Sequence, residues 1–507
     1  MSDLSKNKQP AQSPDIFFKT DHLKGDLKSR SIQGGAITIA SQILKFVLQI
    51  GGTLFLARLL SPEDFGLIGM VAIILNFVEL FKDLGLSTAT LQKAEINHAQ
   101  VSTLFWINVG LSIFISFLVI VLAPSITEFY SEPRLTWIVI ALSGNFLLGG
   151  LTVQHLALLR RQMHFGIIAR IEIASMSVGV AIAIASALLG GSYWALITWR
   201  IAQSITIVLG VWLSCRWRPG LPQWNSEIRS MLKFGSNLAA AGILNYFSRN
   251  ADNFLIGRFW GAQQLGLYAV AYKLLLLPIE QINSPITNVA LPTLSRLQNE
   301  PEKYTQYYYK ALLIITTLGM PIVGFLFIDI NKLIPLTLGQ QWLDAVPIFQ
   351  FLIPAAYVGT FNVATGWAFT SLGQADRQLR YVAIASISNV AIFLISVRWG
   401  AIGVAAAYGL SRPLFILTGL LYCYHGTALS IGKLAKTLSS PFIASVSAIA
   451  VVYSINQFSV VGTNALVSMA IDLIAYCLVY LGSWLILPNG NTSLKDIIVL
   501  AKYLKKT

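Results

Sequence analysis

Residues 101–122 read VSTLFWINVGLSIFISFLVIVL, a run of 22 residues without a charged side chain. A helix needs about 20 apolar residues to cross roughly 30 Å of hydrocarbon. The run lacks the alternating pattern of a barrel strand, so it predicts a membrane-spanning helix. The whole chain is 55% hydrophobic and 11% charged, with a mean hydropathy of +0.66. This composition excludes a water-soluble fold for its 507 residues.

Apolar runs of similar length recur along the chain. Together they predict an all-α polytopic membrane protein with about fourteen transmembrane helices, because a helix satisfies its own backbone inside the bilayer. The predicted spans are residues 34–57, 66–88, 101–122, 135–157, 167–189, 193–213, 231–257, 264–291, 308–328, 346–371, 380–397, 400–424, 440–456 and 465–487.

Lysine and arginine are divided unevenly between the two sides of the predicted membrane. The tails and the connections that follow even-numbered spans hold 26 of them. The connections on the other side hold five, which are Arg58, Arg134, Arg258, Lys332 and Arg398. Cationic residues concentrate on the cytoplasmic side of membrane proteins. The distribution therefore predicts an even number of spans and two cytoplasmic termini.

The chain contains a weak internal repeat. LARLLSPEDFGLIG, which holds Arg58, recurs as LIGRFWGAQQLGLYA, which holds Arg258, at an offset of 200 residues. Six predicted spans separate the copies, which predicts two six-helix lobes related by a pseudo-twofold axis along the membrane normal. The predicted parts are a disordered cytoplasmic tail (1–33), an N-lobe (34–213), a cytoplasmic linker (214–230), a C-lobe (231–424), two appended spans (425–487) and a cytoplasmic tail (488–507).

The net charge of +14 is explained by loops that contact anionic lipid, so it does not indicate nucleic-acid binding. The three cysteines and five histidines are scattered without metal-ligand spacing, and we expect no metal, cofactor or catalytic residue. No glycine-rich phosphate loop or nucleophile motif appears. The longest predicted outer loop, residues 329–345, is too short for the catalytic domain of a polysaccharide polymerase or ligase. The sequence therefore argues against an enzyme.

Ten ionisable residues lie inside or at the edge of the predicted spans. Each costs about 2.5–3.5 kcal/mol at mid-membrane on insertion scales, so each should face a partner or a water-filled cavity. Six of them fall on the first two spans of each lobe, which the repeat axis would bring around a central cleft. The ten are Lys45, Arg200, Arg249, Lys273, Arg412, Glu79, Glu172, Asp252, Glu280 and Asp472.

Helical spacing gives these charges two competing interpretations. Lys45 shares a stripe with neighbouring glutamines, and Arg249 shares one with Asp252, as expected for helices that line a cavity. Alternatively, Arg249 and Asp252 neutralise each other, since they are three residues apart. Arg412 and Asp472 are predicted to lock helices together instead of binding a ligand.

Several segments resemble the polysaccharide-transporter family of oligosaccharide flippases. In the first half these are GLIGMVAIILNFVELFKDLGLSTATLQ, STLFWINVGLSIFISFLVIVLAPSITEFY and VQHLALLRRQMHF, and in the second half SRNADNFLIGRFWG and ALPTLSRLQNEPEKY. The resemblance covers about residues 30–425. It implies the fold of the multidrug/oligosaccharidyl-lipid/polysaccharide exporter superfamily, in which two lobes alternate between inward-open and outward-open states.

The resemblance also implies a function, the transfer of an undecaprenyl-pyrophosphate-linked oligosaccharide across the bacterial inner membrane for O-antigen, capsule or exopolysaccharide assembly. Implied partners are membrane lipids, a polysaccharide polymerase and export machinery. A pyrophosphate needs cationic donors at depth, for which the sequence offers Lys45, Arg249, Lys273 and, as a weaker fourth, Arg200. Candidate sugar-binding residues are Gln42, Gln49, Asn245 and Asn283. Candidate residues for ion coupling are Glu79, Asp252 and Glu280. Glu79 also lies near a cytoplasmic end, where it can reach the headgroup region.

A multidrug exporter of the same superfamily is the nearest alternative. Such pumps usually rely on an acidic site in the first lobe, whereas the first span here holds Lys45 and no acid. The sequence therefore favours a lipid-linked oligosaccharide as the substrate.

Overall fold

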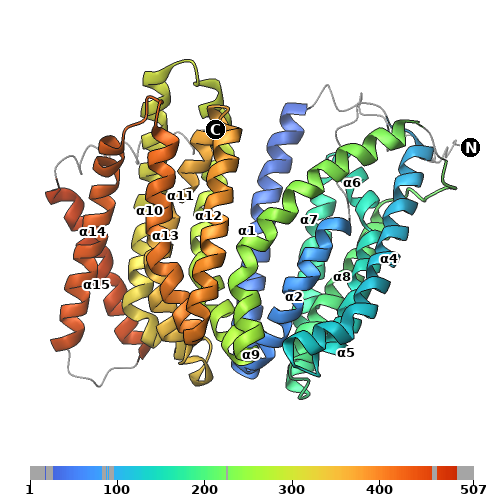
Figure 1. Ribbon diagram of the computed structural model, residues 1–507, viewed down its shortest axis with the longest axis horizontal. Helices are drawn as coiled ribbons and strands as arrows, with labels where there is room; N and C mark the ends of the chain where they lie inside the picture. The colour runs from blue at the N-terminus through green and yellow to red at the C-terminus, as the bar shows by residue number, and fades with distance from the viewer. Residues whose placement is uncertain are drawn as a thin grey trace, which may run out of the picture. The chain divides into compact units, whose positions relative to one another are not determined.

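The computed structural model describes Phe18, residues 27–82, Ser87, Thr90 and residues 96–223, 226–458 and 465–487. Within these residues all regular secondary structure is helical, as predicted (Figure 1). Eleven helical segments of the described chain are long and apolar enough to cross a membrane. Two of the eleven contain a glycine at positive φ, Gly261 at 77° and Gly400 at 70°. The total of fourteen spans stays a prediction.

The chain forms two compact units, residues 1–250 (unit 1) and 251–507 (unit 2). In unit 1, α7 packs against α1 and α8, and α5 packs against α2, α4 and α8. The helices of unit 1 are α1 (Leu27–Leu59), α2 (Pro62–Lys82), α4 (His98–Tyr130), α5 (Leu135–Gly150), α6 (Val153–Arg161), α7 (Phe165–Leu188), α8 (Trp194–Ser214) and the first part of α9 (Ser226–Arg296).

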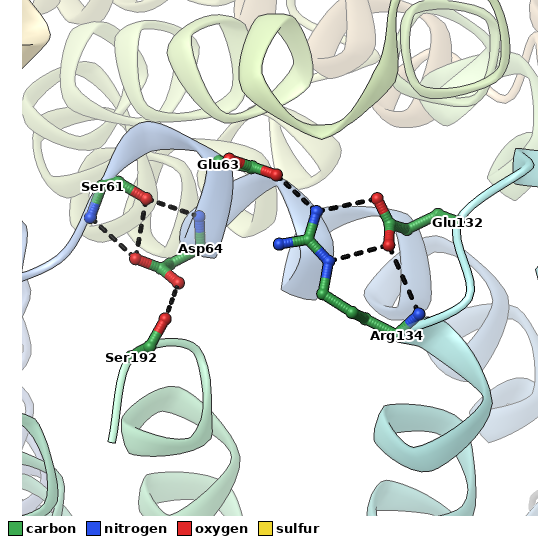
Figure 2. A network of polar contacts seen from close by, with 6 residues as sticks. All are labelled: Ser61, Glu63, Asp64, Glu132, Arg134 and Ser192. Carbon is green, nitrogen blue, oxygen red and sulfur yellow. Dashed lines mark hydrogen bonds and ion pairs between the residues drawn. The ribbon is translucent and has the colours of Figure 1, made fainter. Parts of the chain in front are cut away.

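Short turns join the helices at one end of unit 1, where polar side chains bond the turns together (Figure 2). Ser61 caps α2, because its hydroxyl accepts the Asp64 N–H at 3.2 Å while the Asp64 carboxylate accepts the Ser61 N–H at 2.8 Å. The other oxygen of Asp64 accepts from Ser192, in the turn between α7 and α8. Arg134, between α4 and α5, bonds both Glu132 and Glu63. We call this the turn end of unit 1.

Arg134 also acts on the protonation of its neighbour at the turn end. Its side chain donates to Glu132 Oε1 at 2.8 Å and lowers the pKa of that carboxyl. Glu132 in turn raises the pKa of the guanidinium, mainly through the same hydrogen bond. Both groups are therefore charged over the whole range of neutral pH.

At the opposite end, the segment after α8 is held against α4. Trp106 donates its indole N–H to the Gly220 carbonyl at 2.8 Å, and the Gly220 N–H donates to Ser102 at 2.9 Å. Trp217, 1% exposed, donates to His98 Nδ1 at 3.0 Å. The first half of the predicted linker is therefore fixed to unit 1 by both backbone and side-chain bonds.

Unit 2 has a core of tyrosine, tryptophan and aliphatic side chains. Tyr308 is buried at its centre, donates to the Ala364 carbonyl at 3.0 Å and accepts from the Tyr424 hydroxyl at 3.0 Å. The helices of unit 2 are the second part of α9, α10 (Pro301–Thr337), η3 (Gln340–Trp342), α11 (Ala345–Ser371), α12 (Ala375–Ser396), η4 (Val397–Trp399), α13 (Gly400–Tyr424), α14 (Ile431–Phe458) and α15 (Ala465–Ile486). Within unit 2, α14 and α15 pack against each other and against α10 (Figure 1).

The predicted repeat has a local counterpart in both units. The chain breaks its helix after Leu59 in one copy and at Gly261 in the other. In each copy the leucine that follows the break is buried, Leu67 at 0% and Leu267 at 1% exposure. The symmetry of the two lobes as wholes stays a prediction.

Candidate functional site

A cavity of about 340 Å³ lies within unit 1, between α2, α5 and α8. Each of the three helices lines it with residues at helical spacing. α2 contributes Ile68, Ala72, Leu75 and Asn76, α5 contributes Leu142, Asn145, Phe146, Leu148 and Gly149, and α8 contributes Arg200, Gln203, Ser204 and Ile207. Spacings of three and four residues place side chains on one face of a helix, so each helix presents one stripe to the cavity. We call this space the N-unit cavity.

The lining of the N-unit cavity combines amides with one cation. Asn76, Asn145 and Gln203 supply amides, Arg200 supplies a guanidinium, and no lining residue is acidic. The Oδ1 atom of Asn145 is buried and accepts no hydrogen bond from the described residues. No hydrogen bond or ion pair joins Arg200 to the part of the chain that the structure describes.

Uncompensated polar groups in a membrane helix are costly, so they indicate a function for the cavity. An unpaired arginine in hydrocarbon costs about 2.5–3.5 kcal/mol on insertion scales. Arg200 lies six residues inside α8, or about 9 Å from the start of that helix. A planar guanidinium with five donors suits the oxygens of a phosphate, and nearby amides suit sugar hydroxyls. The arrangement can therefore hold an anionic group with polar substituents.

Lys45, the first of the predicted cations, has a partner inside unit 1. Its Nζ atom lies 2.5 Å from Glu172 Oε2 on α7, and the two side chains are 18% and 32% exposed. The pair joins α1 to α7, two helices that pack closely. Lys45 can therefore bind a phosphate only if its ion pair with Glu172 breaks or if the ammonium binds both groups at once.

The remaining predicted cations lie on α9. Arg249 is exposed and makes no hydrogen bond or ion pair with described residues, and Lys273 is exposed as well. Glu280 is exposed on the same helix. Asn283 is partly buried, and its Oδ1 atom lacks a partner among the described residues. The side chains of Asn245 and Glu79 lie outside the described residues.

Asp252 is a buried carboxylate with neutral partners. It is 3% exposed, and its Oδ2 atom accepts the Tyr268 hydroxyl at 2.8 Å. Its Oδ1 atom accepts the Asn253 N–H, also at 2.8 Å. Its predicted role in ion coupling stays a prediction.

The structure thus places one predicted cation, Arg200, in a described cavity. Arg200 is the weakest of the four cations that the sequence predicts, and Asn76, Asn145 and Gln203 are not among the predicted site residues. The signal was present, because these three amides interrupt otherwise apolar helix faces. Gln42 and Gln49 lie on α1, the first exposed and the second partly buried. In the described ranges, no three His, Cys, Asp or Glu side chains group into a metal site.

Comparison with known proteins places the sequence of this chain in a family. A family model described as "Polysaccharide biosynthesis protein" matches residues 55–347. Lipopolysaccharide biosynthesis protein WzxC of Escherichia coli (strain K12) is 25% identical over 389 residues, which cover 75% of this chain and 78% of WzxC. Teichuronic acid biosynthesis protein TuaB of Bacillus subtilis (strain 168) is 26% identical over 414 residues, 80% of this chain and 85% of TuaB.

The fold is also found among solved structures. Lipid II flippase MurJ, in an inward closed conformation, superposes with a TM-score of 0.70 at 15% sequence identity. The match covers 89% of this chain and 98% of that chain. The likeness confirms the predicted class of fold, an all-α polytopic membrane protein.

Proposed function

The chain belongs to the polysaccharide biosynthesis protein family, and on that premise we propose that it flips a lipid-linked oligosaccharide across a membrane. The substrate is an undecaprenyl-pyrophosphate-linked repeat unit, and the product pathway is O-antigen, capsule or exopolysaccharide synthesis. The protein lies in the bacterial inner membrane with both termini in the cytoplasm, which the 26-to-5 division of Lys and Arg supports.

The observation that carries the proposal is the N-unit cavity. It offers one exposed guanidinium that has no partner among the described residues, three amides and no carboxylate. A pyrophosphate-linked sugar requires both kinds of group, a cation for the phosphate oxygens and amides for the hydroxyls. A cationic drug would be repelled by Arg200 and would find no acid in the lining. The geometry therefore favours the anionic lipid over the multidrug alternative.

Transport by this route makes and breaks no covalent bond. The head group enters the cavity from one leaflet while the isoprenoid chain stays in the bilayer. Arg200 and the amides replace water around the phosphates and sugars, which lowers the barrier to crossing. Alternation of the two units then exposes the head group to the other side, and the driving force is the difference in affinity between the two states. Polymerase and export machinery would take up the delivered repeat unit.

The proposal is tested by Arg200→Ala and Arg200→Lys in a strain that lacks its chromosomal copy of this gene. Hydrogen bonds to charged groups contribute about 1.5–3 kcal/mol each, so loss of the guanidinium should weaken head-group binding by at least tenfold. Arg200→Lys keeps the charge without the fork and should retain part of the surface-polysaccharide output. Immunoblotting of membranes measures the amount of each protein.

The matched control is Arg216→Ala, which removes an exposed arginine just after α8. It should leave polysaccharide output unchanged. Equal output from Arg200→Ala and the control, at equal protein level, would show that the N-unit cavity does not bind the head group. Flipping by purified protein in proteoliposomes, with an undecaprenyl-pyrophosphate oligosaccharide as the probe, tests the substrate class directly.

A further inference from the structure

Three charged side chains meet inside unit 2, where α10 packs against α14 and α15. Lys332 Nζ lies 3.1 Å from Asp329 Oδ1, on the same helix, and forms an ion pair with Asp472 Oδ2 on α15. The ammonium also donates to Ser468 Oγ at 2.9 Å. The Asn456 amide, on α14, donates to Asp472 Oδ2 at 3.3 Å. We call these residues the α10–α15 charge cluster.

The charges in this cluster do not balance. Two carboxylates face one ammonium, so a fully ionised cluster carries one surplus negative charge. The Asp329 side chain is 0% exposed and that of Asp472 is 3% exposed. Among the described residues, the positive charge that acts on Asp329 is Lys332, which is shared with Asp472. A buried carboxylate that shares its one cation with a second carboxylate is disfavoured in its ionised form.

Among the residues that the structure describes, the neighbouring elements supply no second positive charge. The charged groups that act on Asp329 are Lys332 and Asp472. The lysines of α14, Lys433 and Lys436, lie near the opposite end of that helix, about 30 Å from Asn456. The tyrosine hydroxyls of α11 and α15, Tyr357 and Tyr476, bond Ser445 instead. Tyr453 of α14 is exposed, and η3 carries no ionisable side chain.

We propose that Asp329 and Asp472 form a proton-binding site, in which the two carboxylates hold one proton between them beside the Lys332 ammonium. The proton comes from water at the end of unit 2 where α14 and α15 are joined, and it returns there when the site is emptied. Lys332, 27% exposed, connects the buried carboxylates to that surface. A metal cation fits poorly, because it would lie beside the ammonium and Asn456 turns its amide N–H₂, not its oxygen, toward the carboxylate.

The site differs from the residues considered for ion coupling from the sequence, which lie on α2 and α9. Its use as the coupling site of the transporter rests on the proposed function, whereas the binding of a proton does not. Protonation would remove the surplus charge and change how tightly α10 and α15 are held together. The protonated and deprotonated states of the site can therefore favour two different conformations of unit 2.

Infrared difference spectroscopy of the purified full-length protein tests the proposal, because a protonated carboxyl group absorbs apart from a carboxylate. We expect the wild type to show one more protonated carboxyl group near neutral pH than Asp329→Asn. Lys332→Met should show one more than the wild type, since it leaves two carboxylates without a cation. Asp344→Asn, which changes an exposed carboxylate just before α11, serves as the control and should match the wild type.

The number of protonated carboxyl groups shows whether the α10–α15 charge cluster binds a proton, and no transport assay is needed. A wild-type spectrum identical to that of Asp329→Asn at every pH would overturn the proposal. If a substitution prevents folding, Asp472→Asn gives the same comparison from the other carboxylate. Saturable binding of ²²Na⁺ that is lost in both aspartate variants would overturn it in favour of a metal cation. If the wild-type protein shows the proton signal but does not flip the lipid-linked oligosaccharide, that result counts against the proposed function alone.

Discussion

Gly324 of α10 lies where the hydroxyl groups of three other helices converge. A Cβ atom added there would lie closest to Tyr476 Oη, 2.7 Å from Ser445 Oγ and 2.8 Å from Tyr357 Oη. The three hydroxyls are bonded in a row, Tyr357 to Ser445 at 2.6 Å and Ser445 to Tyr476 at 2.7 Å. Gly324→Ala must therefore displace at least one of them, and we predict that it destabilises unit 2.

The size of the effect follows from two opposing contributions. An alanine in a helix is favoured over glycine by roughly 0.5–1 kcal/mol. Overpacking costs about 1–3 kcal/mol, and each disturbed hydrogen bond costs about 1 kcal/mol more. The expected net loss is about 2 kcal/mol in the free energy of unfolding. Gly366→Ala on α11, where a Cβ atom would meet nothing within 4 Å, should instead gain roughly 0.5–1 kcal/mol.

A double-mutant cycle identifies the clash. Tyr476→Phe removes the oxygen nearest to the new Cβ atom and should cost about 1 kcal/mol alone, through the hydrogen bond to Ser445. In the background of Gly324→Ala it should cost about 1 kcal/mol less than that, because it also relieves the contact. Unfolding in mixed micelles, followed by circular dichroism, measures all four proteins. Additivity within about 0.5 kcal/mol, or equal stability of the two alanine variants, would refute the reasoning.

Three further predictions concern other parts of the molecule. Lys45→Glu should lower the amount of folded protein, and adding Glu172→Lys should restore it; restored protein without polysaccharide output would support direct head-group binding by Lys45. Because Arg134 lowers the pKa of Glu132, their contact stabilises the turn end above the ordinary glutamate pKa and is lost as the pH falls through the lowered value. Proteolysis at this turn should rise with acid in the wild type and in Glu128→Gln, and should rise less in Glu132→Gln, where Glu63 is still paired with Arg134. Gly220→Ala, whose Cβ atom would lie 2.9 Å from His98 Nε2, should detach the segment after α8 and expose Trp217, which fluorescence quenching measures.

The class of fold was predictable because every span in hydrocarbon must satisfy its own backbone hydrogen bonds and present apolar side chains. Uninterrupted apolar runs meet both requirements, and the structure confirms a helical membrane protein with helices at these positions. The break between the first two spans of each predicted lobe was also visible, since Arg58 and Arg258 lie just before the two breaks in the helices. Apolar spans and the breaks between them depend on residues that are close together in the sequence, so they can be predicted from a single sequence.

The pairing of charges was less predictable, because partners lie far apart along the chain. Glu172 is 127 residues from Lys45, and Asp472 is 140 residues from Lys332. Lys332 was assigned to an outer loop, whereas α10 extends to Thr337 and places Lys332 inside the packed helices. Asp472 was expected to lock helices together, and its bond to Lys332 does join α15 to α10.

The N-unit cavity was missed for a related reason. A search for charges at depth finds Arg200 but gives no weight to neutral amides, which cost less to bury. Asn76, Asn145 and Gln203 belong to three helices, and only their packing shows that they face one space. The sequence supplies the residue types, and the arrangement depends on tertiary contacts.

The ion pair between Lys332 and Asp472 has a consequence for biogenesis. A chain that emerges from the ribosome N-terminus first delivers Lys332 to the insertion machinery well before Asp472. During that interval Lys332 has Asp329 as its charged partner, and α15 later brings the Asp472 carboxylate, which is costly to place in lipid without a partner. Translation products that stop before residue 465 should therefore be recognised by membrane quality control as unfinished, and a short peptide carrying α15 should rescue them when supplied in trans.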